Sequence, residues 1–262
     1  MKQNPLISII TVSFNALSTI ENTVNSIINQ NYSNIEYIII DGGSTDGTID
    51  IIKKYAQNIT YWISEPDKGI YDAMNKAIKL AKGEWINFMN CGDSFYCEDT
   101  IEQVIEYISK NRNIDIIYGN VIINSNIGKY MILPENLRNI SIHLPFCHQS
   151  TFVKTSIAQK YLFDLQYKFV ADYNFFYCIY KKGYTFLYIN IPIANYQTGE
   201  GFTSNHMYQC ILEEYKVGNR FFSKTTNWKY KIKFFLIKNL PQIIVNKLRY
   251  LQYKNNSRFI KL

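Results

Sequence analysis

The sequence lacks the features that would assign it to the membrane-spanning or disulfide-stabilised proteins. No stretch reaches about 18 uninterrupted apolar residues, so no transmembrane helix is expected. The beginning of the chain lacks the apolar segment and small-residue cleavage site of a signal peptide. The five cysteines are scattered and odd in number, and no C-x-x-C pair occurs, which disfavours a zinc site and a disulfide framework. These absences predict a reducing, cytoplasmic setting.

Acidic residues are missing from the C-terminal segment. Residues 215–262 contain 12 Lys or Arg and no Asp or Glu, which leaves 16 basic and 21 acidic residues in the rest of the chain. Between Trp228 and Arg249 the basic residues alternate with aromatic and aliphatic ones. Such basic amphipathic segments lie on anionic membranes, so we expect peripheral association at the inner face of the cell membrane. A helical pair packed on the body is the alternative, and no motif supports nucleic-acid binding.

The first 110 residues alternate between strand-like and helix-like segments. Apolar residues make up 47% of the chain, enough for a large core. Buried strands are predicted at Leu6–Val12, Glu36–Ile40, Tyr61–Ser64 and Trp85–Met89, and helices after Ser18 or Thr19 and at Thr48–Tyr55, Gly69–Ala81 and Thr100–Ile108. This order predicts an α/β fold with a doubly wound, mostly parallel sheet. Ligands of such sheets bind beyond the carboxyl ends of the strands.

The pattern of the second half is less regular. Ile114–Ile123 is typical of two strands joined by a turn, Phe169–Tyr180 of a helix, and Thr185–Ala194 of a further strand. A loop is expected to begin at Gly199. Only a coarse organisation can be predicted here.

The loop Asp41–Gly47 follows the second predicted strand. Its glycines allow positive φ and close approach to a ligand, and a carboxylate at a strand end can accept hydrogen bonds from a base or a ribose. The alternative is an ordinary tight turn in which Asp46 caps the next helix. The loop matches neither G-x-G-x-x-G nor the P-loop, which disfavours a Rossmann dehydrogenase and an NTPase.

A second polar loop, Asn90–Asp93, follows the fourth predicted strand. A carboxylate at this place could hold Mg²⁺ or Mn²⁺ against a diphosphate and so neutralise a leaving group. The alternative is a turn with a helix-capping Asp93.

Together, several segments resemble the family 2 inverting glycosyltransferases, which have the GT-A fold and commonly build bacterial polysaccharides such as O-antigen. These segments are Pro5–Asn15, Asp41–Gly47, Glu65–Ala77, Gly83–Ile86 and Asn90–Asp93. The resemblance is strong over residues 5–110 and weaker to about residue 205. It implies a nucleotide-sugar-binding half at 1–110 and an acceptor-binding, catalytic-base half at 111–212 of the same domain. Residues 213–262 form the basic C-terminal segment.

The resemblance also assigns residues to the nucleotide site, with Ser44 and Asp46 supporting the loop of Asp41. The nucleotide-binding residues it implies are Val12, Phe14, Asn15, Asp41, Ser44, Lys68, Gly69, Asp72, Asn75, Asn90, Cys91 and Gly92. Asn90–Asp93 occupies the position of the family's metal-binding Asp-x-Asp motif but keeps only Asp93. Dependence on Mn²⁺ or Mg²⁺ is therefore expected to be weaker, and His206 is a further candidate ligand.

Asp172 stands where the family places its general base. Its alternative role is to cap the helix that it opens, and Glu200 is a poorer candidate for the base. His148 and Gln149 precede it and are candidate contacts for the acceptor or the diphosphate, with a purely structural histidine as the alternative.

The resulting prediction is an inverting hexosyl- or N-acetylhexosaminyltransferase. It would move sugar from a nucleotide-sugar, with UDP favoured, to a glycan or a polyprenyl-diphosphate-linked glycan. A non-catalytic nucleotide-sugar- or glycan-binding protein is the main alternative, because Asn90 and Gly92 replace acidic residues of the metal motif. A nucleotidyltransferase is disfavoured because residues 11–20 contain no Lys or Arg.

Overall fold

A parallel four-stranded unit forms one end of the sheet in the computed structural model, which describes residues 4–125, 127–197 and 206–262. Its strands are β1 (Ile7–Ser13), β2 (Ile35–Asp41), β3 (Tyr61–Ser64) and β4 (Trp85–Phe88), in the spatial order β4-β1-β2-β3. The chain moves outward from β1 to β3 and then returns to the other side of β1. This reversal creates a switch point between β1 and β4, where open α/β sheets bind ligands.

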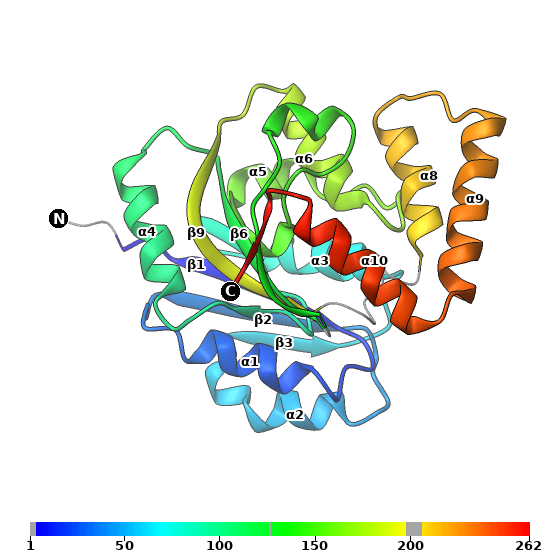
Figure 1. The fold of residues 1–262 in the computed structure, drawn as a ribbon. Helices are drawn as coiled ribbons and strands as arrows, with labels where there is room; N and C mark the ends of the chain where they lie inside the picture. Colours follow the sequence, from blue (N-terminus) through cyan, green and yellow to red (C-terminus); the bar gives the residue numbers. More distant parts are fainter. Residues whose placement is uncertain (1–3, 126, 198–205) are drawn as a thin grey trace.

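The remaining strands add antiparallel pairs to the predicted parallel strands, so the sheet as a whole is mixed. They are β5 (Ser94–Phe95), β6 (Ile116–Ser125), β7 (Gly128–Ile132), β8 (Thr151–Lys154), β9 (Phe186–Gln197) and β10 (Phe259–Lys261). β8 is antiparallel to both β4 and β6, and β7 and β10 extend the edge in antiparallel pairs. β9 runs parallel to β6 and antiparallel to β5. One sheet thus runs through both halves of the chain (Figure 1).

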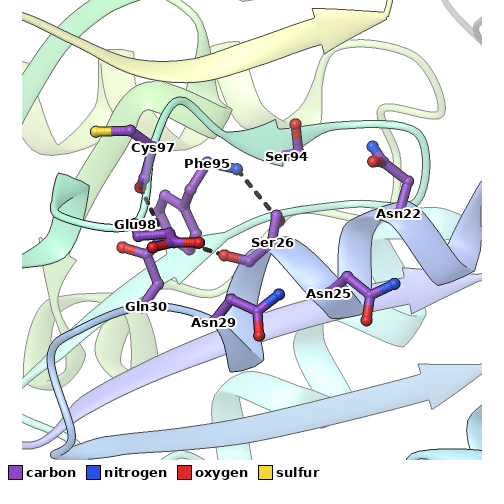
Figure 2. A pocket seen from close by; sticks show the side chains of 9 residues that line it. All are labelled: Asn22, Asn25, Ser26, Asn29, Gln30, Ser94, Phe95, Cys97 and Glu98. Carbon is purple, nitrogen blue, oxygen red and sulfur yellow. Dashed lines mark hydrogen bonds between the residues drawn. The ribbon is translucent and has the colours of Figure 1, made fainter.

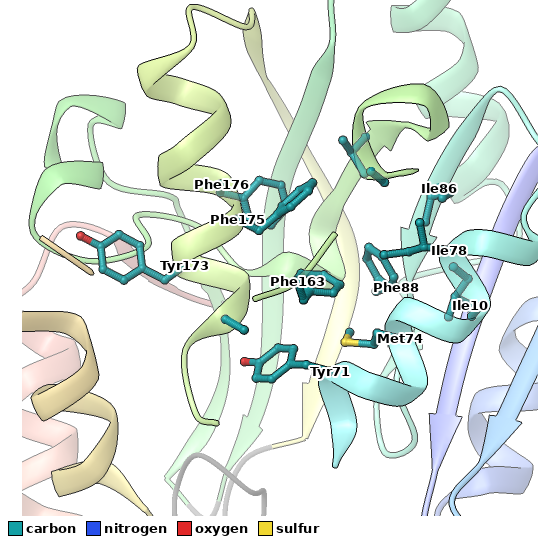
Figure 3. Close-up of a cluster of buried hydrophobic side chains, with 14 of the residues drawn as sticks. Ile10, Tyr71, Met74, Ile78, Ile86, Phe88, Phe163, Tyr173, Phe175 and Phe176 are labelled. Carbon is teal, nitrogen blue, oxygen red and sulfur yellow. The ribbon is translucent and has the colours of Figure 1, made fainter. Parts of the chain in front are cut away.

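Helices cover both faces of this sheet, because β1 alternates its side chains between two cores. Ile7 and Ile9 pack with α1, α2 and α4, whereas Ile10 and Val12 pack with α3, α5 and α6. The helices are α1 (Ile20–Ile28), α2 (Thr48–Lys54), α3 (Ile70–Leu80), α4 (Thr100–Lys110), α5 (Thr155–Tyr161) and α6 (Ala171–Lys181). Short 3₁₀ turns lie at Ala56–Asn58, Leu137–Ser141 and His148–Ser150. Figure 3 shows Phe163 between α3 and α6 in the second core.

Gly119 explains a second difference from the sequence-based prediction. The expected turn within Ile114–Ile123 is absent, and β6 runs through these positions with an irregular register against β9. A Cβ atom at Gly119 would lie 2.7 Å from the carbonyl oxygen of Ile191. The glycine therefore allows close packing of two strands and does not mark a turn.

The C-terminal segment consists of α8 (Met207–Val217), α9 (Lys224–Asn239) and α10 (Gln242–Lys254), followed by β10. In Figure 1, α9 lies beside α8, and α10 leads back toward the sheet. Among the described residues no helix is long and apolar enough to cross a membrane. The loop predicted from Gly199 and the candidate Glu200 lie outside the described residues.

Candidate active site

The Asp41 carboxylate organises the loop after β2. The Asp41 side chain is fully buried, and its oxygens accept hydrogen bonds from the hydroxyls of Ser13, Ser44 and Ser64 and the amides of Gly43 and Ser44. Burial opposes ionisation, but these hydrogen bonds outweigh it and lower the pKa of the carboxyl below its ordinary value. Asp41 is thus ionised and surrounded by protein donors, so a base would have to replace one of them to reach it.

Asn15 and Asp46 join the loops after β1 and β2. Asn15, with φ of 47°, donates its amide to the Ser44 hydroxyl at 2.7 Å and accepts from the Thr45 amide at 3.0 Å. Asp46 accepts from the amides of Leu17 and Thr48, and from the Thr48 hydroxyl at 2.6 Å. Asp46 therefore binds the first amide of α2, whose cap residue is Gly47, and also holds the first loop in place.

An open face lies beside these loops. The Phe14 ring is 65% exposed, and both this ring and the Asp67 carboxylate lie against Gly42, where a Cβ would be 2.6 Å from Asp67 Oδ2. Gly69, with φ of 113°, begins α3, and no atom lies within 4 Å of a Cβ placed there. Lys68 is exposed, and its amide donates to Asp72 at 3.0 Å. An exposed aromatic ring and an unobstructed glycine leave room for a flat ligand.

Two residues predicted to contact the nucleotide have side chains that are engaged within the protein. Asn75 is buried, and its amide group donates to the carbonyl of Phe163 and accepts from its amide, both at 2.8 Å. Val12 is 6% exposed and packs in the core. Their side chains are thus turned toward the protein interior, because a buried backbone needs hydrogen-bond partners and the core needs apolar volume.

The loop Asn90–Asp93 follows β4 at the switch point. Asp93 is buried, its Oδ2 accepts from Gln149 Nε2 at 2.9 Å, and its carbonyl accepts from the Thr23 hydroxyl at 2.7 Å. Gly92 has φ of 99°, and burial raises the pKa of the Cys91 thiol well above its ordinary value. β5 follows this loop, and the cap of α4 is Asp99, so the helix-capping alternative for Asp93 is wrong.

The oxygen atoms of this loop suit a hard divalent cation, although few protein groups contribute. Among the described residues, no group of three or more His, Cys, Asp and Glu side chains could hold a metal ion. Asp93 supplies a carboxylate, and Asn90 Oδ1 is buried without a hydrogen-bond partner. A carboxylate and an amide oxygen are ligands that Mg²⁺ and Mn²⁺ accept when substrate phosphates complete the shell.

His206 is the other predicted metal ligand. It precedes α8, and its ring lies 5.0 Å from the ring of Phe169. The structure therefore places His206 beside the residues that precede α6, whereas Gln149 is a side-chain partner of Asp93.

Asp172 lies at the centre of a hydrogen-bonded chain that crosses between the two halves. His148 Nδ1 is 3.2 Å from Asp172 Oδ2, and the Tyr71 hydroxyl donates to Asp172 Oδ1 at 2.9 Å. On its other side, His148 Nε2 is 3.3 Å from Asn90 Nδ2. The tautomer with hydrogen on Nδ1 satisfies both contacts of the imidazole. The chain links Tyr71 on α3, Asp172 on α6 and the loop after β4.

The electrostatics of this chain keep Asp172 ionised. Burial opposes the charge of its carboxylate, but His148, through its hydrogen bond and its charge, and the Tyr71 hydroxyl together lower the pKa of Asp172 below its ordinary value. Burial, followed by the charge of Asp172, raises the pKa of Tyr71 well above its ordinary value. The pair therefore consists of a carboxylate acceptor and a neutral phenol donor at neutral pH.

Asp172 reaches this position because the chain before α6 is held by α8. The cap residue of α6 is Val170, with no side-chain capping bond, so the carboxylate of Asp172 is free of that task. Glu213 on α8 accepts from the amides of Lys168, Phe169 and Val170. Tyr71 and Glu213 escaped the sequence analysis, since their partners lie 101 and 43 to 45 residues away along the chain.

A shallow cavity of about 220 Å³ lies away from this site, between α1 and β5. Figure 2 shows its polar lining, in which the Phe95 amide donates a hydrogen bond to the Ser26 hydroxyl. Asn22, Asn25 and Asn29 lie along one side of α1. Neither Asp41 nor Asp172 lines it.

Comparison with known proteins supports the arrangement. Residues 8–186 match the model of glycosyl transferase family 2. A PGL/p-HBAD biosynthesis glycosyltransferase of Mycobacterium bovis is 28% identical over 221 residues, 82% of this chain and 86% of the relative. An uncharacterised glycosyltransferase of Mycobacterium tuberculosis is 33% identical over 67% of this chain and 69% of its own length. The family match spans both Asp41 and Asp172.

Solved structures share the fold. S. aureus TarS in complex with UDP-GlcNAc matches with a TM-score of 0.64 at 18% identity, over 80% of this chain and 66% of that one. The mannosyltransferase PcManGT of Pyrobaculum calidifontis, in complex with GDP-Man and Mn²⁺, matches with a TM-score of 0.62 at 16% identity, over 81% and 64%. This chain thus spans about two thirds of these structural neighbours. The GT-A fold predicted from the sequence is confirmed.

Proposed function

The chain belongs to glycosyl transferase family 2, and from that premise we propose that it is an inverting enzyme that moves a sugar from a nucleotide-sugar to a glycan acceptor. The observation that carries the proposal is the partly buried, ionised Asp172, whose carboxylate is held between His148 and Tyr71. A carboxylate fixed in this way is suited to act as a general base.

The transfer step follows from the position of Asp172. Its carboxylate takes the proton of an acceptor hydroxyl while that oxygen forms a bond to the anomeric carbon. The bond from that carbon to the diphosphate breaks on the opposite face, and the nucleoside diphosphate leaves with the electron pair. The configuration at the anomeric carbon is therefore inverted. His148 and Tyr71 hold the carboxylate in its acceptor orientation through both oxygens.

The donor would lie across the ends of β1, β2 and β4. The exposed Phe14 ring offers a stacking face for the base, and Lys68 and Gly69 lie near the path of the ribose and diphosphate. Asn15, Asp41 and Ser44 maintain the loop beneath them. We favour a UDP-sugar with a hexosyl or N-acetylhexosaminyl group, in view of the UDP-GlcNAc bound to TarS.

A divalent cation fits the diphosphate end of this site. Asp93 would hold it, with Asn90 Oδ1 as a second oxygen, and the Mn²⁺ of PcManGT makes this ion a reasonable choice. When bound, the cation neutralises charge on the departing diphosphate. His148 contacts Asn90 and Gln149 donates to Asp93, so the proposed acceptor side would lie next to the cation.

The acceptor we propose is a glycan, or a glycan linked to polyprenyl diphosphate, in the synthesis of a cell-surface polysaccharide. Relatives named for PGL/p-HBAD biosynthesis and, over 40% of this chain, for teichuronic acid biosynthesis in Bacillus subtilis support this class. A lipid-linked acceptor would bring the reaction to the inner face of the cell membrane.

A transfer assay with a panel of nucleotide-sugars, with Mn²⁺ present or absent, tests the function. Asp172→Asn should lower kcat about 10²- to 10⁴-fold with little change in donor binding, because only the proton acceptor is lost. Asp50→Asn, on the exposed side of α2, is the matched control. Activity of Asp172→Asn near that of the wild type would remove Asp172 from the mechanism.

The second candidate function is a non-catalytic nucleotide-sugar-binding protein, motivated by Asn90 and Gly92 in the metal motif. Such a protein has no use for a carboxylate fixed from both sides by His148 and Tyr71, which favours the enzyme. Calorimetry with UDP beside a turnover assay separates the two: binding without turnover of any donor would support the binding protein.

A further inference from the structure

Helix α9 carries apolar side chains on two faces, and one of these faces packs against α8. The inner face holds Asn227, Tyr230 and Phe234 at helical spacing. Asn227 accepts a hydrogen bond from Tyr208 of α8, and Phe234 packs edge-on against the same Tyr208 at 6.3 Å between ring centroids. This face therefore attaches α9 to the body.

The outer face of α9 is equally apolar and has no cover. Trp228 is 70% exposed, Phe235 68% and Leu236 52%, and Ile232 lies between them. The spacing of these four residues places them in one stripe along the helix. A helix that needed only to pack on α8 would carry polar residues here.

Helix α10 repeats the arrangement. Its inner Val245 is buried, and Tyr253 stacks on Phe259 at 4.2 Å between ring centroids. Its outer side shows Ile244, Leu248 and Leu251, which are 41%, 52% and 43% exposed at helical spacing. The two helices together expose what we call the tail surface: Trp228, Ile232, Phe235, Leu236, Ile244, Leu248 and Leu251.

Exposed cations border the tail surface. By helical spacing, Lys229 and Lys231 flank the stripe of α9 on opposite sides, and Lys247 flanks that of α10. Residues 215–262 contain no Asp or Glu to compensate them. Apolar residues that include a tryptophan, bordered by lysines, match the boundary between acyl chains and anionic headgroups.

We infer that the tail surface binds an anionic lipid bilayer, with α9 and α10 lying in the plane of the headgroups. An isologous contact with a second copy is disfavoured, because it would bring the same uncompensated cations together. Interfacial binding needs no spanning helix, in agreement with the lengths and compositions of the described helices. Since α9 packs on α8, and Glu213 of α8 holds the residues before Asp172, the bound helices would fix the catalytic half relative to the bilayer.

Flotation of the full chain with vesicles tests this inference without any turnover. We expect binding to phosphatidylcholine vesicles that contain phosphatidylglycerol, at least tenfold weaker binding without it, and weakening by added salt. The pair Trp228→Ser and Phe235→Ser should weaken binding more than tenfold. Lys231→Gln should weaken it about fivefold. Leu80→Ser and Lys79→Gln, at exposed positions at the end of α3, are matched controls and should bind as the wild type.

A second measurement guards against misfolded variants. Trp228 fluorescence should shift to shorter wavelength when anionic vesicles are added, and Trp228→Phe should abolish the shift, because Trp85 is buried and Trp62 on β3 packs partly buried against the core. Equal binding to neutral and anionic vesicles would overturn the inference, as would full binding by the Trp228→Ser, Phe235→Ser pair. So would a stable dimer in light scattering that this pair dissociates.

Discussion

His148 Nδ1 lies 3.2 Å from Asp172 Oδ2, while its Nε2 lies 3.3 Å from Asn90 of the loop after β4. One imidazole thus connects the carboxylate proposed as the base with the loop proposed to hold the diphosphate. Because Tyr71 occupies the other oxygen of Asp172, the carboxylate is fixed from both sides. Changes at these neighbours should alter the rate and its pH dependence before they alter the fold.

His148→Ala should lower kcat about 10- to 100-fold, since a hydrogen bond to a charged group contributes about 1.5–3 kcal/mol. His148 lowers the pKa of Asp172, so its removal should move the acid limb of the rate profile to higher pH. The measurement is kcat and KM for donor across the acid range. A raised donor KM with unchanged kcat would instead make His148 a diphosphate ligand. His143→Ala, whose ring contacts Glu135 at 2.9 Å, is the matched control.

Asp41→Asn should destabilise the protein by about 3 kcal/mol, because one amide oxygen replaces two carboxylate oxygens among buried hydroxyl and amide donors. The folded pKa of Asp41 is depressed, so its stabilisation is present above its ordinary pKa of about 3.9 and is lost as pH falls through the folded value. Urea unfolding should therefore show a difference between wild type and variant that narrows with acidification. A constant difference would exclude the charge as its cause.

The parallel half of the fold could be predicted because its strands are buried on both faces and are therefore continuously apolar. Leu6–Val12 and Glu36–Ile40 predicted β1 and β2 to within one or two residues. β5 and β8 escaped prediction, since strands of two and four residues carry little periodicity and pair with distant segments. The turn predicted within Ile114–Ile123 is wrong, since Gly119 in this segment permits close packing of β6 against β9 and forms no turn.

The candidate site was predicted unevenly for the same reason. Asp46 and Ser44 act within a local loop, and their supporting roles followed from the motif. Tyr71 stands inside a segment that carried the family resemblance, yet its hydrogen bond to Asp172 spans 101 residues. The family resemblance implies a nucleotide contact for Asn75. Its observed partner, the backbone of Phe163, lies 88 residues further along the chain and has no local pattern in the sequence.

Asn75→Ala decides between these two interpretations. If Asn75 is structural, its loss leaves the amide and carbonyl of Phe163 without these partners. The free energy of unfolding, measured with urea, should then fall by about 2–5 kcal/mol. The donor dissociation constant of the folded variant should stay near that of the wild type. An unchanged free energy of unfolding together with weakened donor binding would instead support Asn75 as a nucleotide contact. Lys76→Ala, the next residue on α3, supplies a partly exposed control.

Asp93 should carry the metal dependence of donor binding. Titration of the wild type with UDP, with and without Mn²⁺, should give a metal-dependent gain in affinity, and Asp93→Ala should lose that gain while keeping the metal-free affinity. Gln149→Ala, which removes the 2.9 Å hydrogen bond to Asp93 Oδ2, should weaken the gain about tenfold, because such contacts orient a ligand without touching the ion. Equal affinity of wild type and Asp93→Ala in Mn²⁺, together with transfer rates untouched by EDTA, would exclude the cation. Side chains such as Lys68 would then have to neutralise the charge of the departing diphosphate.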